Sequence, residues 1–199
     1  MTPERKTKLL NVLYKRQPNL TVVMENVQDP HNISAVMRSC DAVGIQDIYI
    51  ITTKIARHKK FGAKSSSSAA KWLTVHAYDN VEACYNALRT QYQRIYTTHL
   101  CANAEPLYAL DFVQNSIALV FGNEHEGVSE DARRLADGNF IIPQVGIIQS
   151  LNISVACAVS IYEAFRQKQQ AGHYNSPGLA AQSINRLLSE WGVPNAEND

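Results

Sequence analysis

The sequence predicts an α/β fold in which a mostly parallel sheet carries helices on both of its faces. Two observations lead to this prediction. Short apolar runs such as LTVVMEN and SIALVFG recur without alternating polar positions, which is typical of parallel strands covered on both faces. Between these runs lie segments with the apolar periodicity of helices, and strands that alternate with helices at this spacing form parallel sheets.

The first predicted element is an amphipathic helix at 3–16, with leucine and valine on one side and lysine and arginine on the other. Strands are predicted at 20–26, 47–52, 73–78, 94–100, 116–122 and 139–144. Helices are predicted at 32–43, at 80–91, behind the turn that follows residue 122, and at 150–172, with a short helix in the C-terminal segment. We therefore expect one domain over residues 1–199, with a helical extension at 1–18, a core at 19–172 and a second extension at 173–199.

Composition excludes several classes of protein. The net charge of +1 is not that of a general polyanion binder, so any contact with nucleic acid has to come from a local patch. The cysteines form no CxxC pair and no zinc-type spacing with histidine, so we expect reduced thiols and no metal site. The amino terminus is too charged for a secretory signal and no apolar run reaches transmembrane length, which predicts a cytoplasmic protein without a membrane partner.

The stretch QDPHNISAVMRSCDAVG, residues 28–44, reads as a strand-to-helix turn followed by a helix that ends at Gly44. Asn32 and Ser34 have the side chains that cap free N–H groups at a helix start. Arg38 is not explained by capping. It is either a surface ion-pair partner, which contributes little to stability, or a guanidinium placed beside exposed helix N–H groups to bind a phosphate.

The stretch FGNEHEGVSE, residues 121–130, follows the most strand-like run in the chain. Gly122 allows a ligand to approach the backbone closely, and Gly127 allows a second tight turn. Glu124 and Glu126 then lie at the carboxyl end of a strand, where open α/β sheets bind ligands. The alternative is a solvent-exposed acidic turn, which we favour for Glu126. The glycine spacing does not match GxGxxG, so a dinucleotide fingerprint is not predicted.

The stretch IIPQVGIIQSLNISVACAV, residues 141–159, is apolar where a loop should be polar. Because Ile147 and Ile148 are costly to expose, we expect this loop to be tucked in and to line a pocket with its backbone groups. Ser150 and Asn152 either cap the next helix or reach into the pocket. The small residues of that helix permit close packing against another helix, within this subunit or in a second one.

Together and in this order, the three stretches resemble the motifs of the SpoU/TrmH family, which are S-adenosylmethionine-dependent RNA ribose 2′-O-methyltransferases of the SPOUT superfamily. The resemblance covers roughly residues 20–170. Ser34 stands where the family often has glycine, and the tRNA-specific TrmH branch shares this serine. The resemblance implies a deep trefoil knot in the C-terminal part, and a homodimer formed through the helix at 150–168 and the helix of the first motif. It also implies tRNA as the substrate, at the 2′-hydroxyl of guanosine 18 in the D-loop.

The resemblance also implies roles for individual residues. By position, the contacts to S-adenosylmethionine fall on Thr98, His99, Leu100, Gly122, Ile142, Ser150 and Leu151. The catalytic set is Arg38 with Asn32, Glu124, Ser150 and Asn152. The family proposal makes the arginine the base, yet a guanidinium has no lone pair to offer, so we leave open whether Arg38 is the base or a phosphate clamp.

We expect the RNA-binding surface to consist of cations in the two helical extensions and in the basic segment 54–71, with no role in DNA binding. These residues are Arg5, Lys6, Lys8, Lys15, Arg16, Arg57, Lys59, Lys60, Lys64, Lys71, Arg166 and Lys168. Three alternatives remain at this stage. The chain could methylate ribosomal RNA or another tRNA nucleotide, bind RNA without catalysis, or be a flavodoxin-like or dehydrogenase-like nucleotide binder. The last is disfavoured because the glycine-rich phosphate loop is missing.

Overall fold

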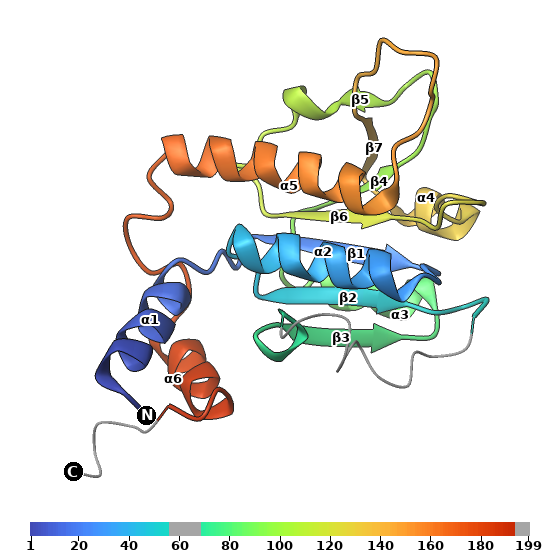
Figure 1. The fold of residues 1–199 in the computed structure, drawn as a ribbon. Helices are drawn as coiled ribbons and strands as arrows, with labels where there is room; N and C mark the ends of the chain where they lie inside the picture. The colour runs from blue at the N-terminus through green and yellow to red at the C-terminus, as the bar shows by residue number, and fades with distance from the viewer. Residues whose placement is uncertain (56–68, 194–199) are drawn as a thin grey trace.

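The structure, a computed structural model, describes residues 1–55 and 69–193. One seven-stranded sheet runs through it in the order β3-β2-β1-β6-β4-β7-β5, and every strand pairing within the described ranges is parallel (Figure 1). The strands are β1 (Leu20–Glu25), β2 (Asp47–Ile51), β3 (Thr74–Tyr78), β4 (Arg94–Thr98), β5 (Glu105–Pro106), β6 (Ile117–Phe121) and β7 (Gly138–Ile141). The predicted α/β fold with a parallel sheet is therefore confirmed.

Helices α2 (Pro30–Ala42) and α5 (Ile153–Gln170) cover one face of the sheet and pack against each other (Figure 1). Alternation along the strands supplies the apolar surface beneath them: Val22 and Met24 of β1 point to this face, whereas Val23 points to the other. Cys40 of α2 and Cys157 of α5 are fully buried in this layer.

Helices α3 (Val81–Leu88) and α4 (Glu130–Leu135) cover the opposite face. Tyr85 of α3 is buried and donates a hydrogen bond of 3.0 Å from its hydroxyl to the carbonyl of Ala132 in α4. The central strands β1 and β6 are buried along their whole length between the two helical layers, which accounts for their continuous apolar sequences.

The two helical extensions pair with each other beside the sheet. Helix α1 (Pro3–Tyr14) and helix α6 (Ala181–Glu190) form their own small apolar cluster around Leu9, Leu13 and Leu187 (Figure 1). Trp191 joins this cluster and packs edge-on against Trp72, with the ring centroids 5.1 Å apart. Each predicted extension thus contains a helix, and the two helices pack together although they are far apart in the sequence.

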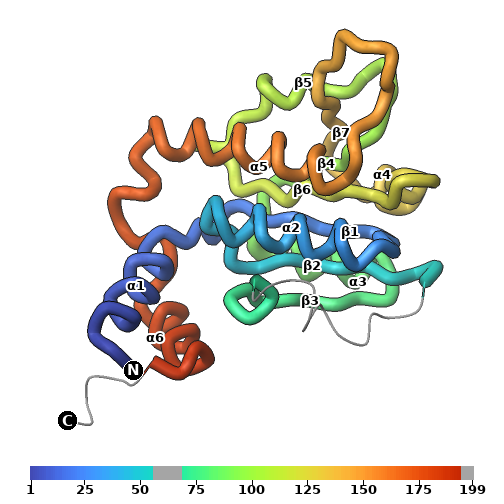
Figure 2. Tube along the Cα trace, viewed as in Figure 1, coloured from blue at the N-terminus to red at the C-terminus, as the bar shows by residue number. Residues whose placement is uncertain are grey.

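The order of the strands determines where a site can form. After β1 the chain moves outward to β2 and β3, then crosses back to β4 on the far side of β6. This reversal is the kind of switch point at which open α/β sheets bind ligands, at the carboxyl ends of the strands. The loop between β7 and α5 and the segment after β4 extend beyond the strands at this end (Figure 2).

Three short features were not predicted from the sequence. They are the edge strand β5 and the 3-10 turns at Ala69–Lys71 and Leu107–Ala109. Each is only two or three residues long, so no periodicity could reveal it. Within the described ranges, no helix has both the length and the apolar character needed to cross a membrane.

Candidate active site

A cavity of about 750 Å³ opens at the carboxyl edge of the sheet. Its walls come from three places: the segment after β4, the turn after β6, and the loop that leads from β7 into α5. All of the residues predicted to contact the cofactor line this cavity, namely Thr98, His99, Leu100, Gly122, Ile142, Ser150 and Leu151. Its volume is that of a site for a small molecule.

The turn after β6 is compact because Gly122 and Gly127 lie against each other. A Cβ atom added to Gly122 would lie 1.9 Å from the carbonyl carbon of Gly127, so no other residue fits there. Gly127 has φ of +67°, as predicted for a second tight turn. The Asn123 side chain closes the turn by accepting hydrogen bonds from the N–H groups of His125 and Glu126, at 2.9 and 2.8 Å. Gly122 therefore allows the close approach of the chain's own backbone, and it also lines the cavity.

A chain of polar side chains links the three sequence motifs. Asn32, at the start of α2, donates a hydrogen bond to the carboxylate of Glu124 in the turn after β6. Asn152 donates from its amide nitrogen to the Oδ1 atom of Asn32, at 3.2 Å. The Oδ1 atom of Asn152 in turn accepts from the backbone N–H of Ser154, at 2.9 Å, and so caps α5. Three residues predicted to be catalytic are thereby brought together.

Arg38 lies apart from this network. It is on the exposed side of α2, six residues after Asn32, which is about 9 Å along the helix axis. Arg38 does not line the cavity, and among the described residues none forms a hydrogen bond or ion pair with it. Ser150 does line the cavity and is exposed.

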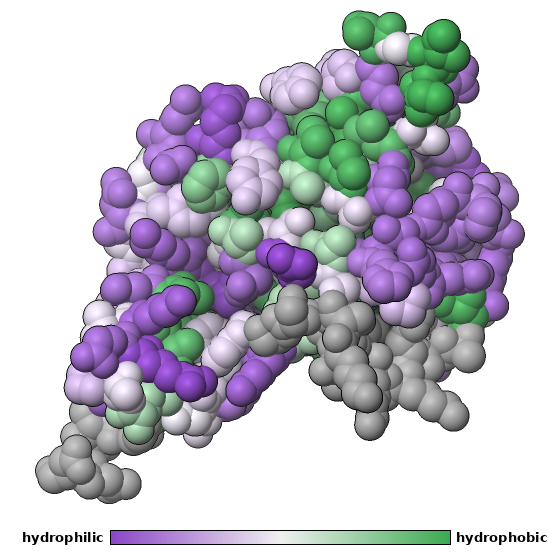
Figure 3. All heavy atoms as spheres, in the orientation of Figure 1, coloured by the Kyte–Doolittle hydropathy of each residue, from purple (hydrophilic) through white to green (hydrophobic). Residues whose placement is uncertain are grey.

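The loop between β7 and α5 corrects one prediction. Gln144, Gly146 and Ile148 line the cavity, as expected, but the apolar side chains at the tip are not tucked in. Ile147 is 97% exposed and Ile148 is 69% exposed in the single chain. Hydrophobic surface accordingly gathers at this end of the molecule, over the loop and the start of α5 (Figure 3).

The wall formed by residues 98–101 is held from behind by two side chains. Asn139 of β7 donates a hydrogen bond to the carbonyl oxygen of His99. Arg133 of α4 contacts the His99 ring, with 2.8 Å between its Nη1 atom and Nε2 of the histidine. Partial burial, followed by the positive charge of Arg133, lowers the pKa of His99 below its usual value.

Two of the predicted RNA-binding cations are corrected by the structure, because both are fully buried. Arg16 donates to the Asp41 carboxylate at 2.7 Å, and to the carbonyl oxygens of Ile45 at 3.1 Å and Trp72 at 3.2 Å. Lys168 donates from Nζ to the side-chain oxygen of Asn19 at 2.7 Å, and burial lowers the pKa of Lys168 to about 8. Neither side chain is accessible to RNA in this structure.

The other predicted RNA-binding residues lie in different places. Arg5, Lys8 and Lys15 are exposed on or next to α1, while Lys6 is half-buried. Lys71 is exposed and lies over the Trp72 ring, and Arg166 is exposed but forms an ion pair with Glu163 of its own helix, at 2.8 Å. Arg57, Lys59, Lys60 and Lys64 lie outside the described residues.

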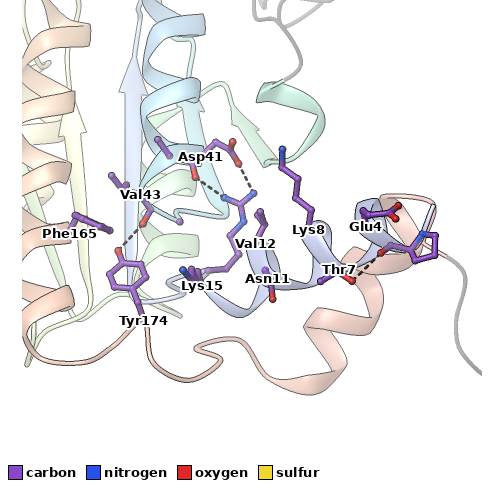
Figure 4. A pocket seen from close by; sticks show the side chains of 14 residues that line it. Glu4, Thr7, Lys8, Asn11, Val12, Lys15, Asp41, Val43, Phe165 and Tyr174 are labelled. Atoms are coloured by element: carbon purple, nitrogen blue, oxygen red, sulfur yellow. Dashed lines mark hydrogen bonds and ion pairs between the residues drawn. The ribbon is translucent and has the colours of Figure 1, made fainter. Parts of the chain in front are cut away.

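A second cavity of about 730 Å³ lies between α1 and the carboxyl end of α2, away from the polar network (Figure 4). Lys8, Lys15 and Arg16 line it from one side, and Val43, Phe165 and Tyr174 from the other. It holds none of the residues predicted to bind the cofactor.

Sequence reasoning missed residues that support the site. Glu25, buried at the end of β1, accepts a hydrogen bond from the N–H of Ser129 at 2.8 Å and so holds the start of α4. Asn26 has φ of +52° and accepts from the N–H groups of Thr53 and Lys54, at 2.9 and 3.0 Å. Asparagine tolerates positive φ better than most residues, so an asparagine directly after a strand could have indicated a turn at this position. Within residues 1–55 and 69–193, no three histidine, cysteine, aspartate or glutamate side chains are placed to hold a metal ion.

Comparison with known proteins identifies relatives of this chain. Residues 19–162 match the model of the SpoU rRNA Methylase family. The chain is 36% identical over 192 residues to the tRNA (guanosine(18)-2′-O)-methyltransferase of Thermus thermophilus, an alignment that covers 96% of each protein. It is similar to the crystal structure of the Aquifex aeolicus TrmH/SpoU tRNA modifying enzyme, with a TM-score of 0.87, 34% identity and 94% coverage of both chains.

A more distant solved structure carries a bound ligand. The AdoMet-bound rRNA methyltransferase of Sinorhizobium meliloti matches with a TM-score of 0.64 and 26% identity. That match covers 79% of this chain but only 59% of the rRNA enzyme.

Proposed function

The chain belongs to the SpoU rRNA methylase family, and from this premise we propose that it transfers a methyl group from S-adenosylmethionine to a ribose 2′-hydroxyl of tRNA, at guanosine 18 in the D-loop. The observation that supports the proposal best is the hydrogen-bonded set of Asn32, Glu124 and Asn152. It joins three motifs at the edge of a cavity whose lining is the one expected for the cofactor.

The residues that line the cavity fit S-adenosylmethionine. Leu100, Ile142 and Leu151 offer apolar surface to a flat base, and the loop segments around them carry backbone donors and acceptors for its edge. Glu124 adds negative charge, which suits a cationic ligand, whereas the carboxylate of Glu126 forms an ion pair with Lys54. When bound, the cofactor supplies a methyl group on a positively charged sulfur.

The side chains of this protein then have distinct tasks. Asn32 orients the Glu124 carboxylate and is itself held by Asn152, so that Glu124 is placed to receive the proton of the ribose hydroxyl. Arg38 binds an RNA phosphate and orients the ribose, because a guanidinium donates hydrogen bonds and cannot act as a base while it is protonated. Ser150 contacts the cofactor or the ribose from the end of the loop, three residues before α5 begins.

The same membership supports the finer proposals about architecture: one domain with a core at 19–172, a deep trefoil knot in its C-terminal part, and a homodimer located in the cytoplasm. The exposed apolar loop gives the homodimer a physical reason. Val155 and Tyr162 of α5 are 47% and 50% exposed, and they continue the apolar surface of Ile147 and Ile148 along the helix.

We favour tRNA over ribosomal RNA because of how much of each relative the chain spans. The Thermus thermophilus enzyme that acts on tRNA guanosine 18 is matched over 96% of its length, helical extensions included. The Sinorhizobium meliloti rRNA methyltransferase is matched over 59% of its chain. The Aquifex aeolicus structure, described as a tRNA modifying enzyme, is matched over 94% of its chain.

The test is to map methylated riboses in RNA after incubation with the protein and S-adenosylmethionine. We expect a single 2′-O-methyl group at guanosine 18 of tRNA, and none when that nucleotide is replaced by another. A methyl group at a different tRNA nucleotide or in ribosomal RNA would contradict the target while leaving the reaction class intact. Transfer that strictly requires added Mg²⁺ would contradict a metal-free mechanism.

A further inference from the structure

We propose that Arg133 is a positioning residue of the cofactor cavity, which holds the wall at residues 98–101 in place through its hydrogen bond to the ring of His99. The inference rests on the proposed function, because it concerns the cavity assigned to the cofactor. Arg133 is not among the residues that the sequence motifs assigned to the site; it lies on α4 and does not line the cavity.

The contact between the two side chains fixes the state of the histidine. An arginine side chain can only donate, so the Nε2 atom of His99, 2.8 Å from Nη1 of Arg133, has to be the acceptor. His99 is therefore neutral, with its proton on Nδ1. The carbonyl oxygen of His99 is held separately by Asn139. The ring of His99 is thus hydrogen-bonded to α4, and its backbone carbonyl is hydrogen-bonded to β7.

Among the charged groups around His99, Arg133 is the one that contacts the ring and favours its neutral form. From α4 the guanidinium of Arg133 faces the ring, and from β7 the uncharged amide of Asn139 contacts the backbone. Within its own segment the exposed Cys101 accepts a hydrogen bond from Asn139 at 3.3 Å. Across the cavity the turn after β6 contributes Glu124, His125 and Glu126. Burial and Arg133 both lower the pKa of His99, so both favour the neutral ring.

Protonation of His99 would break this arrangement. An imidazolium Nε2 carries a proton and cannot accept from Arg133, and two positive groups at this distance repel each other. Because the pKa of His99 is lowered, the wall stays in place to a more acidic pH than an ordinary histidine would allow. Without Arg133, the pKa of His99 should rise toward its ordinary value, and the wall should lack its contact with α4 at every pH.

The experiment compares Arg133→Leu with Arg134→Leu, a matched control that removes the same charge from the next position of α4, where the arginine pairs with Asp131. Binding of S-adenosylhomocysteine is measured by calorimetry between about pH 5 and pH 8, the range in which histidine titrates. We expect Arg133→Leu to bind about fivefold more weakly than the wild type at pH 8, where the hydrogen bond of the wild type is intact. The difference should shrink toward pH 5, where protonation of His99 breaks that bond in the wild type as well, whereas Arg134→Leu should follow the wild type at every pH. Arg133→Lys, which keeps a charged donor, should restore part of the difference.

A second measurement needs no ligand. Nuclear magnetic resonance of histidine-labelled protein reports the tautomer and the titration of His99 directly. We expect Nδ1–H in the wild type and a raised pKa in Arg133→Leu. Identical His99 titration in both proteins, or identical pH profiles of binding, would overturn the positioning role. A wild-type protein that binds no S-adenosylhomocysteine at any pH would instead contradict the proposed function.

Discussion

At the scale of single residues, the exposure of Arg38 is compatible with the role proposed for it. Its side chain has no hydrogen-bond or ion-pair partner within the described part of the chain, so it contributes little to the stability of the fold. An exposed guanidinium without a partner remains available for a phosphate. Capping explains Asp29 at the start of the same helix, where its carboxylate accepts from the N–H of His31 at 2.8 Å, but it does not explain Arg38.

We predict that Arg38→Ala lowers the rate of methyl transfer by roughly 10³-fold, as expected when a group that stabilises the transition state is removed. Arg38→Lys should also fail, because an ammonium does not reproduce the planar donor set of a guanidinium. Cofactor affinity should stay close to normal, since Arg38 does not line the cavity. Single-turnover rates and calorimetry separate the two quantities. Wild-type turnover in either variant would show that Arg38 has no part in the reaction.

The sequence predicted the residues of the polar network better than it predicted which basic side chains reach the surface. Asn32, Glu124 and Asn152 come from three motifs, and the structure joins them by hydrogen bonds. Arg16 and Lys168 show the limit of such reading. A basic residue on a predicted helix looks solvent-exposed, and only tertiary structure reveals that these two side chains turn inward to carbonyl and amide oxygens.

At the scale of elements, Arg16 joins the helical extensions to the core. It follows α1, binds Asp41 in α2, and has its guanidinium carbon 5.5 Å from the centre of the Trp191 ring after α6. Three parts of the chain therefore meet at one side chain. Sequence periodicity predicted both extensions but could not predict this junction, because its members are separated by up to 175 positions, from residue 16 to residue 191.

We predict that Arg16→Met lowers the free energy of unfolding by about 3 kcal/mol, because it leaves a partly buried carboxylate and two carbonyl groups without their donor. Lys15→Met is the matched control: the neighbouring side chain is exposed, and its loss should change stability by less than about 0.5 kcal/mol. Urea denaturation measures both variants. Equal stability of the two would mean that the Arg16 contacts contribute nothing net.

The α1 helix also carries the exposed cations proposed for RNA binding, and its packing decides how they can be tested. Deleting residues 1–16 would remove Leu9 and Leu13 from the apolar cluster with α6 as well as the buried Arg16, so it would damage the fold. Neutralising exposed side chains avoids this problem.

We predict that the triple variant Arg5→Gln, Lys8→Gln, Lys15→Gln binds tRNA at least about tenfold more weakly. The slope of the logarithm of its affinity against the logarithm of salt concentration should fall by the equivalent of up to about three phosphate contacts. The control neutralises three exposed arginines associated with α3, β4 and α4: Arg89, Arg94 and Arg134. It should leave tRNA affinity nearly unchanged. Equal effects of the two triple variants would indicate that overall charge, rather than the α1 surface, governs binding.

At the scale of the whole molecule, the most unusual feature is an apolar surface that a monomer would leave exposed to water. Val145, Ile147 and Ile148 are exposed at the tip of the loop before α5, and Val155 and Tyr162 are half exposed along that helix (Figure 3). The sequence indicated that this loop should not face water, yet the single chain leaves it there. The sequence predicted that the apolar side chains of this loop would be buried. A partner subunit can bury them as well as the chain's own core can.

We predict that the protein sediments as a dimer, at twice its 22.2 kDa mass, at micromolar concentration. Val155 and Tyr162 are seven residues apart and lie on the same side of α5, so Val155→Asp with Tyr162→Asp would place two charges on the surface proposed for the dimer. We expect this double variant to be monomeric, because an unpaired carboxylate is costly to bury in an interface. Tyr14→Asp is the matched control: Tyr14 is 45% exposed but belongs to α1, outside α5 and the loop before it, so its replacement should leave the dimer intact. Because the loop that carries Ile147 also lines the cofactor cavity, the monomeric variant should lose cofactor affinity as well. A wild-type protein that sediments as a monomer and still transfers methyl groups at full rate would contradict the homodimer.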